Sequence, residues 1–311
     1  MNYFKIKFKE VFYLGKEILL KSIKISNGET LGYRESGSGN KILVLVHGNM
    51  SSSKHYDVLI EALSEDYKIY AVDLRGFGTS TYKTPIDSIN DFANDLRLFV
   101  DALNLKDFYL GGWSTGGPVS MQFIINNPDY VRKLILIESV GIKGYLICET
   151  DENGTPIPTK PYQSKENLGK DAFSILPILD ANKRRDKNFY KALWDAAIYT
   201  ENRPSEEKYD EYLEDMLTQV NTLDVYWALQ NFNITHEHNG VAEGTGGIDK
   251  LALPTIILQG ERDLVIPPAT GEEIKQGLGD NALLIKLPSG HSPFIDCLDL
   301  LAENMTNFIE K

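Results

Sequence analysis

A glycine-flanked serine between two apolar stretches limits how this chain can fold more than any other feature. Residues 108–111 are typical of a buried strand, and residues 119–125 have the length and spacing of a helix. Between them, residues 112–116 read Gly-Trp-Ser-Thr-Gly, the pattern that holds a nucleophilic serine on a sharp strand-to-helix turn. Free N–H groups at the start of the helix favour a developing negative charge beside that serine. The pattern predicts an α/β core with Ser114 as a candidate nucleophile.

Apolar runs alternate with helical patterns along most of the chain. The runs typical of buried strands are 41–46, 68–72, 108–111, 131–137, 254–260 and 283–287. Such an alternation predicts the α/β class, with a doubly wound and mostly parallel sheet. Sites in these sheets lie at the carboxyl ends of the strands. Four polar residues follow directly after predicted strands, namely His47, Asp73, Ser114 and Glu138.

The rhythm breaks between residues 142 and 247, where no strand–helix–strand pattern appears. Residues 151–170 lack periodicity, and three helices are predicted at 185–199, 206–217 and 224–231. We therefore predict a helical cap at 142–247 over a core of residues 22–141 and 248–311. The cap is dense in aromatic residues, and we expect some to pack its helices and others to line an apolar pocket.

Charge and cysteine usage narrow the function classes. The chain has 311 residues and a net charge of −12, which argues against nucleic acid as the main partner. Its two cysteines, Cys148 and Cys297, have no metal-ligand spacing and favour reduced thiols in a cytoplasmic protein. No apolar run reaches the ~20 residues needed to cross a bilayer.

The N-terminal segment, residues 1–21, is positively charged, whereas the chain as a whole is negatively charged. Residues 1–24 hold six lysines against two glutamates, interleaved with apolar residues. The lysines interrupt any signal-peptide core. Two interpretations stay open: an extra element packed on the domain, or a basic amphipathic segment that makes a peripheral contact with a membrane or a hydrophobic granule.

A serine hydroxyl needs a base, and the base needs an orienting carboxylate. Of five histidines, only His291 lies in a glycine-flanked loop directly after a late strand. Asp263 follows the strand that ends at residue 260, and Glu138 is the alternative carboxylate. The two histidines in residues 235–240 are two apart rather than four, so we predict a loop facing the pocket and no metal site.

The chain order Ser114, Asp263, His291 is that of α/β-hydrolases. Together with His-Gly-Asn at 47–49 and Asp-Leu-Arg-Gly-Phe-Gly-Thr-Ser at 73–80, it makes residues 22–311 resemble the α/β-hydrolase superfamily. The resemblance implies an oxyanion hole formed by the backbone N–H groups of Asn49 and Thr115. It also implies structural roles for His47, Asp73 and Arg75. Dehalogenases and epoxide hydrolases of this fold use an aspartate nucleophile, so the serine argues against both.

The Gly-Trp-Ser-Thr-Gly-Gly elbow at 112–117 and Glu-Ser-Val-Gly at 138–141 are similar to bacterial intracellular esterases. Some of these are described as short-chain polyhydroxyalkanoate depolymerases and others as acyl-homoserine lactonases. We therefore expect a serine hydrolase of small apolar or short-chain esters that uses no cofactor and takes a small-molecule substrate. The alternatives are cleavage of a lactone, a thioester or a C–C bond with the same triad, or a ligand-binding receptor of this fold. The oligomeric state is not encoded in any of these patterns.

Overall fold

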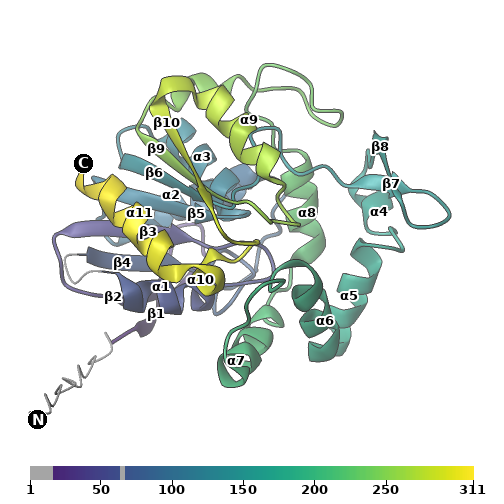
Figure 1. Ribbon diagram of the computed structural model, residues 1–311, viewed down its shortest axis with the longest axis horizontal. Coiled ribbons are helices and arrows are strands. Elements are labelled where there is room, and N and C mark those ends of the chain that lie inside the picture. Colours follow the sequence, from purple (N-terminus) through teal and green to yellow (C-terminus); the bar gives the residue numbers. More distant parts are fainter. Residues whose placement is uncertain (1–16, 64–66) are drawn as a thin grey trace, which may run out of the picture.

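The computed structural model describes residues 17–63 and 67–311, and the chain forms an eight-stranded sheet flanked by helices (Figure 1). The strand order is β1-β2-β4-β3-β5-β6-β9-β10. These strands are β1 (Leu19–Lys24), β2 (Thr30–Ser36), β3 (Lys41–Val46), β4 (Tyr67–Val72), β5 (Phe108–Trp113), β6 (Val131–Ile137), β9 (Thr255–Gly260) and β10 (Ala282–Leu287). The pairs β1–β2 and β2–β4 are antiparallel, and every other pair is parallel. The predicted α/β class and mostly parallel sheet are confirmed.

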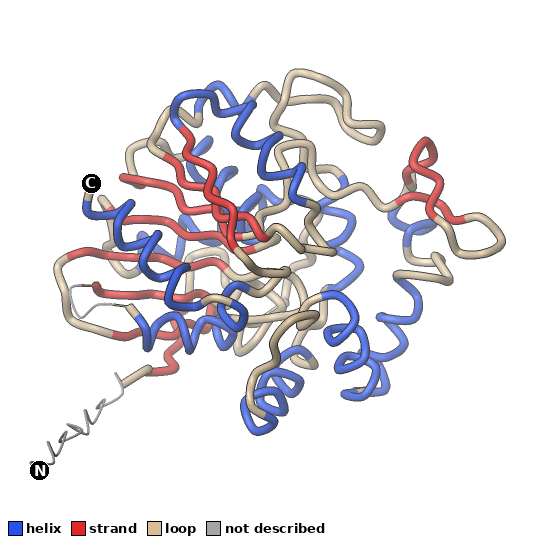
Figure 2. The backbone as a smooth tube through the Cα atoms, in the orientation of Figure 1, coloured by secondary structure: helices blue, strands red, loops and turns tan. Residues whose placement is uncertain are grey.

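Helices cover both faces of the sheet (Figures 1 and 2). One face carries α2 (Ile89–Ala102), α3 (Gly116–Asn126) and α9 (Pro268–Leu278), and the other carries α1 (Asp57–Ala62) and α11 (Leu298–Glu310). All six residues of β5 are buried, because this strand lies in the middle of the sheet with helices on both sides. The central strand is therefore a rigid support for the turn that follows it.

The remaining elements lie mostly between β6 and β9 in the chain. They are β7 (Cys148–Thr150), β8 (Pro156–Pro161), α4 (Lys165–Leu168), α5 (Ile175–Arg184), α6 (Lys187–Ala197), α7 (Glu206–Met216) and α8 (Thr222–Gln230). We call β7 to α8 the cap, and the exact division at residues 142 and 247 stays a prediction. Short 3₁₀ turns occupy Ser53–Tyr56, Gly247–Lys250 and Gly279–Asn281, and α10 spans Pro293–Asp296. Figure 2 shows α5, α6 and α7 grouped away from the sheet, with loops between them and the strands.

Two local features differ from the pattern-based expectation. The stretch at 151–170 without periodicity contains β8, which pairs with β7 just before it to form a hairpin, and the short helix α4. Helix α5 is not among the predicted helices. Its Pro177 lies in the first turn, where the missing N–H removes no helical hydrogen bond.

The predicted basic segment lies largely outside the described residues, which begin at Glu17. Within them, β1 starts at Leu19 and pairs with β2, so that Leu19 stands opposite Glu35. Among the residues that the structure describes, no helix has the length and apolar character to span a bilayer.

Candidate active site

Ser114 lies on a tight turn directly after β5. Its φ of 53° is in the left-handed region, and its N–H donates to the Ile137 carbonyl oxygen over 3.0 Å. The flanking glycines are required by space: a Cβ on Gly112 would lie 2.3 Å from the Gly116 carbonyl oxygen, and one on Gly116 would lie 2.0 Å from the Val46 carbonyl oxygen. The serine is therefore held in a strained backbone conformation by close packing against β3.

The loop after β3 lies against this turn. A Cβ on Gly48 would lie 3.0 Å from the Ser114 Cβ, closer than an ordinary contact, so the absence of a side chain at Gly48 favours this close approach. The next residues are Asn49 and Met50, and Met50 has a φ of 53°. Within the described ranges, the N–H groups of Asn49 and Thr115 donate to no other protein atom. Both residues line the same cavity as Ser114.

His291 lies in the loop after β10, and its Nδ1 is 2.8 Å from Asp263 Oδ2. The other carboxylate oxygen of Asp263 accepts hydrogen bonds from the N–H groups of Val265 and Ile266, each over 2.8 Å. Burial alone would raise the pKa of Asp263. The charge and hydrogen bond of His291 together with the backbone donors outweigh it, so the pKa is lowered. The carboxylate is thus held ionised beside the imidazole.

Glu138 lies behind this pair, fully buried, with a φ of 43°. Its Oε2 accepts from the Gly260 N–H (2.7 Å) and from Gln259 Nε2 (3.0 Å), and its Oε1 accepts from Ser289 Oγ (3.1 Å). Burial, followed by the charge of Asp263, raises the pKa of Glu138 well above its usual range. Of the two strand-end carboxylates, Asp263 is the one that contacts the imidazole.

A cavity of about 520 Å³ lies between the sheet and the cap. Ser114 and His291 are in its wall, and Asp263 lies behind His291. The cap contributes mainly large apolar and aromatic side chains, including Phe173, Phe189 and Trp194. No Asp, Glu, Lys or Arg is among the described residues that line it. The cavity therefore offers an apolar wall around a small polar centre.

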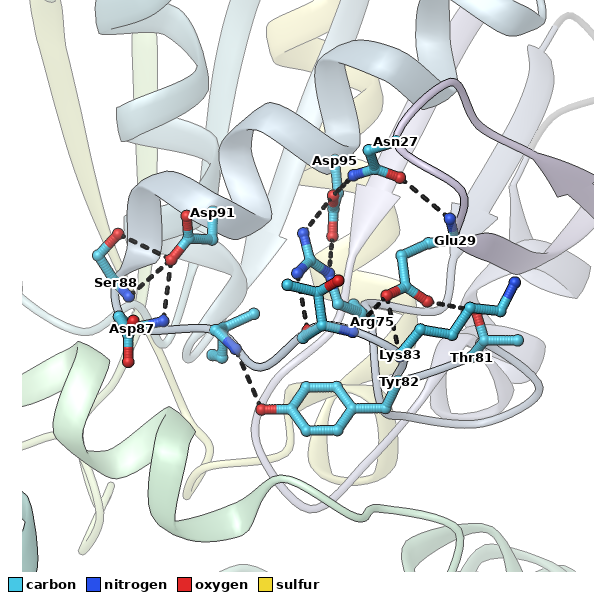
Figure 3. Close-up of polar contacts among 12 residues, drawn as sticks. Asn27, Glu29, Arg75, Thr81, Tyr82, Lys83, Asp87, Ser88, Asp91 and Asp95 are labelled. Atoms are coloured by element: carbon cyan, nitrogen blue, oxygen red, sulfur yellow. Dashed lines mark hydrogen bonds and ion pairs between the residues drawn. The ribbon is translucent and has the colours of Figure 1, made fainter.

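Figure 3 shows a polar network that joins Arg75, in the loop after β4, to Asp95 of α2. The Arg75 guanidinium forms two 2.6 Å hydrogen bonds to Asp95, one to each carboxylate oxygen, and both residues are buried. Nearby, Asp73 accepts from the Ser53 and Thr79 N–H groups, each over 2.9 Å. These contacts fit the structural roles that the resemblance implies for Asp73 and Arg75.

His47 and the loop at 235–240 lie apart from the reacting groups. His47 is fully buried, and its Nε2 accepts from the Leu74 N–H over 2.9 Å. The expectation that residues 235–240 face the pocket is wrong: none of them lines the cavity. His236 is exposed instead, with its Nε2 3.1 Å from Asp249 Oδ1. The loop packs closely beside the 3₁₀ turn at Gly247–Lys250: a Cβ on Gly246 would lie 3.1 Å from His236 Cε1.

One residue next to the site was not indicated by the sequence. Gln219 lies between α7 and α8, is 1% exposed, and hydrogen-bonds to both Asn49 and Met50. No motif or periodicity marks it, because a single glutamine in a loop resembles any other until the fold is known.

Comparison with known proteins agrees with this fold. Residues 41–297 match the family described as the α/β hydrolase fold. The chain is 25% identical over 301 residues to Lipase 1 of Psychrobacter immobilis, covering 94% of this chain and 84% of that protein. It is 22% identical to a 2-hydroxy-6-oxononadienedioate/2-hydroxy-6-oxononatrienedioate hydrolase of a Pseudomonas species, with coverage of 94% and 96%. The solved structure of an esterase from Exiguobacterium antarcticum has the same fold, with a TM-score of 0.73, 20% identity and coverage of 94% and 100%.

Proposed function

Because the chain belongs to the α/β-hydrolase family, we propose that this hydrolase cleaves carboxylic esters with small, neutral, apolar acyl groups through a Ser-His-Asp triad. The observation that carries the proposal is the 2.8 Å contact between His291 Nδ1 and Asp263 Oδ2, beside a cavity lined by both Ser114 and His291. A base oriented by a buried carboxylate next to a strained serine is the arrangement that acyl transfer requires.

In the first half-reaction, Ser114 Oγ forms a bond to the ester carbonyl carbon while its proton passes to His291 Nε2. The resulting oxyanion accepts hydrogen bonds from the N–H groups of Asn49 and Thr115, each worth about 3 kcal/mol of barrier. The tetrahedral intermediate collapses, the alkoxide leaves, and it takes the proton from His291. Water then attacks the acyl-enzyme by the same route and releases the acid. Asp263 fixes the imidazole tautomer and stabilises its protonated form.

The cavity wall supports a neutral substrate. A carboxylate taken into an apolar cavity costs several kcal/mol unless a cation pairs with it. No lysine or arginine is among the described lining residues. This argues against a substrate like the dicarboxylate named for the Pseudomonas relative. Lactones and thioesters of apolar acids would be attacked in the same way and belong in the same assay panel.

The test is steady-state hydrolysis of p-nitrophenyl esters from acetate to decanoate, with a γ-lactone and an acyl thioester alongside. We expect multiple turnover that is fastest with short or medium neutral acyl groups. Ser114→Ala should abolish it while the circular dichroism spectrum stays unchanged. Turnover by folded Ser114→Ala protein would exclude the serine mechanism, and a single slow turnover with retained product would favour a receptor.

A further inference from the structure

The cap holds the loop that carries Asn49. Gln219, between α7 and α8, uses its side-chain amide for three hydrogen bonds. Its Oε1 accepts from the Met50 N–H over 3.1 Å, and its Nε2 donates to Asn49 Oδ1 over 2.8 Å. The same Nε2 donates to Asn221 Oδ1 over 3.2 Å. One cap side chain therefore binds two consecutive residues of a core loop, one through its backbone and one through its side chain.

The loop needs such an external partner. Met50 has a left-handed φ of 53°, a conformation that costs a residue with a Cβ about 1 kcal/mol or more. Gly48 has no side chain and packs directly against Ser114. The bond from Met50 N–H to Gln219 fixes the plane of the peptide between Asn49 and Met50. The bond to Asn49 Oδ1 fixes the side chain of the same residue.

Gln219 is itself held in place. Its carbonyl oxygen accepts from Asn182 Nδ2 of α5 over 2.8 Å. Its neighbour Asn221 donates through Nδ2 to the Arg75 carbonyl oxygen over 2.7 Å. Gln219 is 1% exposed, so its amide does not exchange hydrogen bonds with water. Its position is therefore set by α5 on one side and by the core on the other.

We propose that Gln219 is a positioning residue of the oxyanion hole, through which the cap sets the direction of the Asn49 N–H. The inference rests on the proposed serine mechanism, in which that N–H binds the oxyanion. Displacing such a donor by about 1 Å lowers the reaction rate by about 10²-fold, because stabilisation of the oxyanion depends on preorganised geometry. Docking of the cap is then a condition for chemistry as well as for substrate binding.

The test compares two buried cap glutamines. Gln219→Met keeps the side-chain length and removes the polar contacts. Gln230→Met is the matched control: Gln230 is also fully buried, accepts from the Ile147 N–H over 3.0 Å, donates to the Tyr162 carbonyl oxygen, and does not touch the oxyanion loop. For Gln219→Met we expect kcat on p-nitrophenyl butyrate to fall about 10- to 100-fold, with KM within about twofold of wild type. Gln230→Met should lower the unfolding midpoint and leave kcat within about twofold.

A transition-state analogue supplies a readout that loss of stability does not move. Phenylboronic acid forms a tetrahedral adduct with a nucleophilic serine, so its Ki should rise in Gln219→Met by the factor by which kcat/KM falls. Asn49→Ala tests the contact from the core side, and serves alone should Gln219→Met fail to fold. In the Asn49→Ala background, Gln219→Met should cost less than it does in wild type, since the contact between Asn49 and Gln219 is already absent and only the contact with the Met50 N–H is left to lose.

The outcomes separate this inference from the proposed function. If wild type hydrolyses esters, Ser114→Ala is inactive, and Gln219→Met behaves like Gln230→Met, Gln219 does not position the oxyanion hole. Losses from Asn49→Ala and Gln219→Met that multiply fully in the double variant overturn the part played by the contact between Gln219 and the Asn49 side chain. If Ser114→Ala stays active, the serine mechanism itself fails, whatever Gln219 does.

Discussion

Replacement of Asp263 by asparagine isolates the role of its charge. Asp263 Oδ1 accepts from the backbone N–H groups of Val265 and Ile266, while Oδ2 faces His291 Nδ1. An asparagine at this position must keep its carbonyl oxygen toward the two backbone donors. Its NH₂ group then faces His291 Nδ1, which has to accept a hydrogen bond instead of donating one. The imidazole proton moves to Nε2, and the nitrogen that should receive the serine proton is already protonated.

The side-chain amide of the asparagine in this variant cannot avoid the unfavourable contact by rotating. The opposite orientation would direct the NH₂ group at two buried N–H groups and leave both without an acceptor, at about 1–3 kcal/mol each. The variant is therefore held in the unproductive tautomer. By analogy with other triads we expect kcat to fall about 10⁴-fold, which corresponds to ~5.4 kcal/mol of activation free energy.

Glu138→Gln is the matched control, because it makes the same chemical change at the other strand-end carboxylate. Burial and the charge of Asp263 raise the pKa of Glu138, which favours its neutral form, and glutamine is a neutral group of similar shape. We expect less than a tenfold loss of kcat. The assay is kcat on p-nitrophenyl butyrate at pH 8, with circular dichroism as the fold check. A large loss in Glu138→Gln with little loss in Asp263→Asn would refute this assignment of the acid.

Two further predictions concern stability. The pKa of Glu138 in the folded state is above the usual glutamate value of about 4.3. As pH rises above that value, the unfolded state releases a proton that the native state keeps, so Glu138 lowers the free energy of unfolding progressively. The unfolding midpoint of Glu138→Gln relative to wild type should therefore rise from pH 4.5 to pH 8, and a constant difference would contradict the buried protonated state. Arg75→Met leaves Asp95 buried without its counter-ion and should lower the free energy of unfolding by about 3 kcal/mol in urea titrations. Lys170→Met breaks an exposed ion pair with Glu166 and should not change the free energy of unfolding. If Arg75→Met lowered this free energy no more than Lys170→Met does, the buried pair would be unimportant for stability.

The parallel sheet was predictable because its central strands are buried on both faces. The apolar runs at 41–46 and 131–137 coincide with β3 and β6, and the last four residues of each strand are all buried, so that no polar residue interrupts the pattern there. The cap was harder to predict. The hairpin β7–β8 is largely exposed, so it lacks the hydrophobic periodicity that marks a buried element. Helix α5 buries Ile175, Ile178 and Ala181 on one face, but it is short and has a proline in its first turn.

The candidate site was partly readable for a similar reason. Strand ends in a parallel sheet meet at one edge, so Ser114, Asp263 and His291 were identified from their positions after strands. The choice between Asp263 and Glu138 depends on which carboxylate the imidazole reaches, and that is a distance between side chains more than 20 residues apart in the chain. Gln219 depends on the docking of two segments that share no local signal. The assigned roles stay predictions until the variants are measured.

The cap leaves the sheet after β6 and returns at β9, and these two strands are hydrogen-bonded neighbours. In polymer terms, the chain between β6 and β9, here called the excursion, is a long loop whose two ends are held side by side in the sheet. Closing a loop of roughly 120 residues costs about 2 kcal/mol more than closing one of about 10, because the entropy grows only with the logarithm of length. Insertions or deletions in this excursion therefore place little thermodynamic load on the sheet. Lineages that share this core are free to exchange the excursion and, with it, most of the cavity wall, while the elbow and its strands stay unchanged.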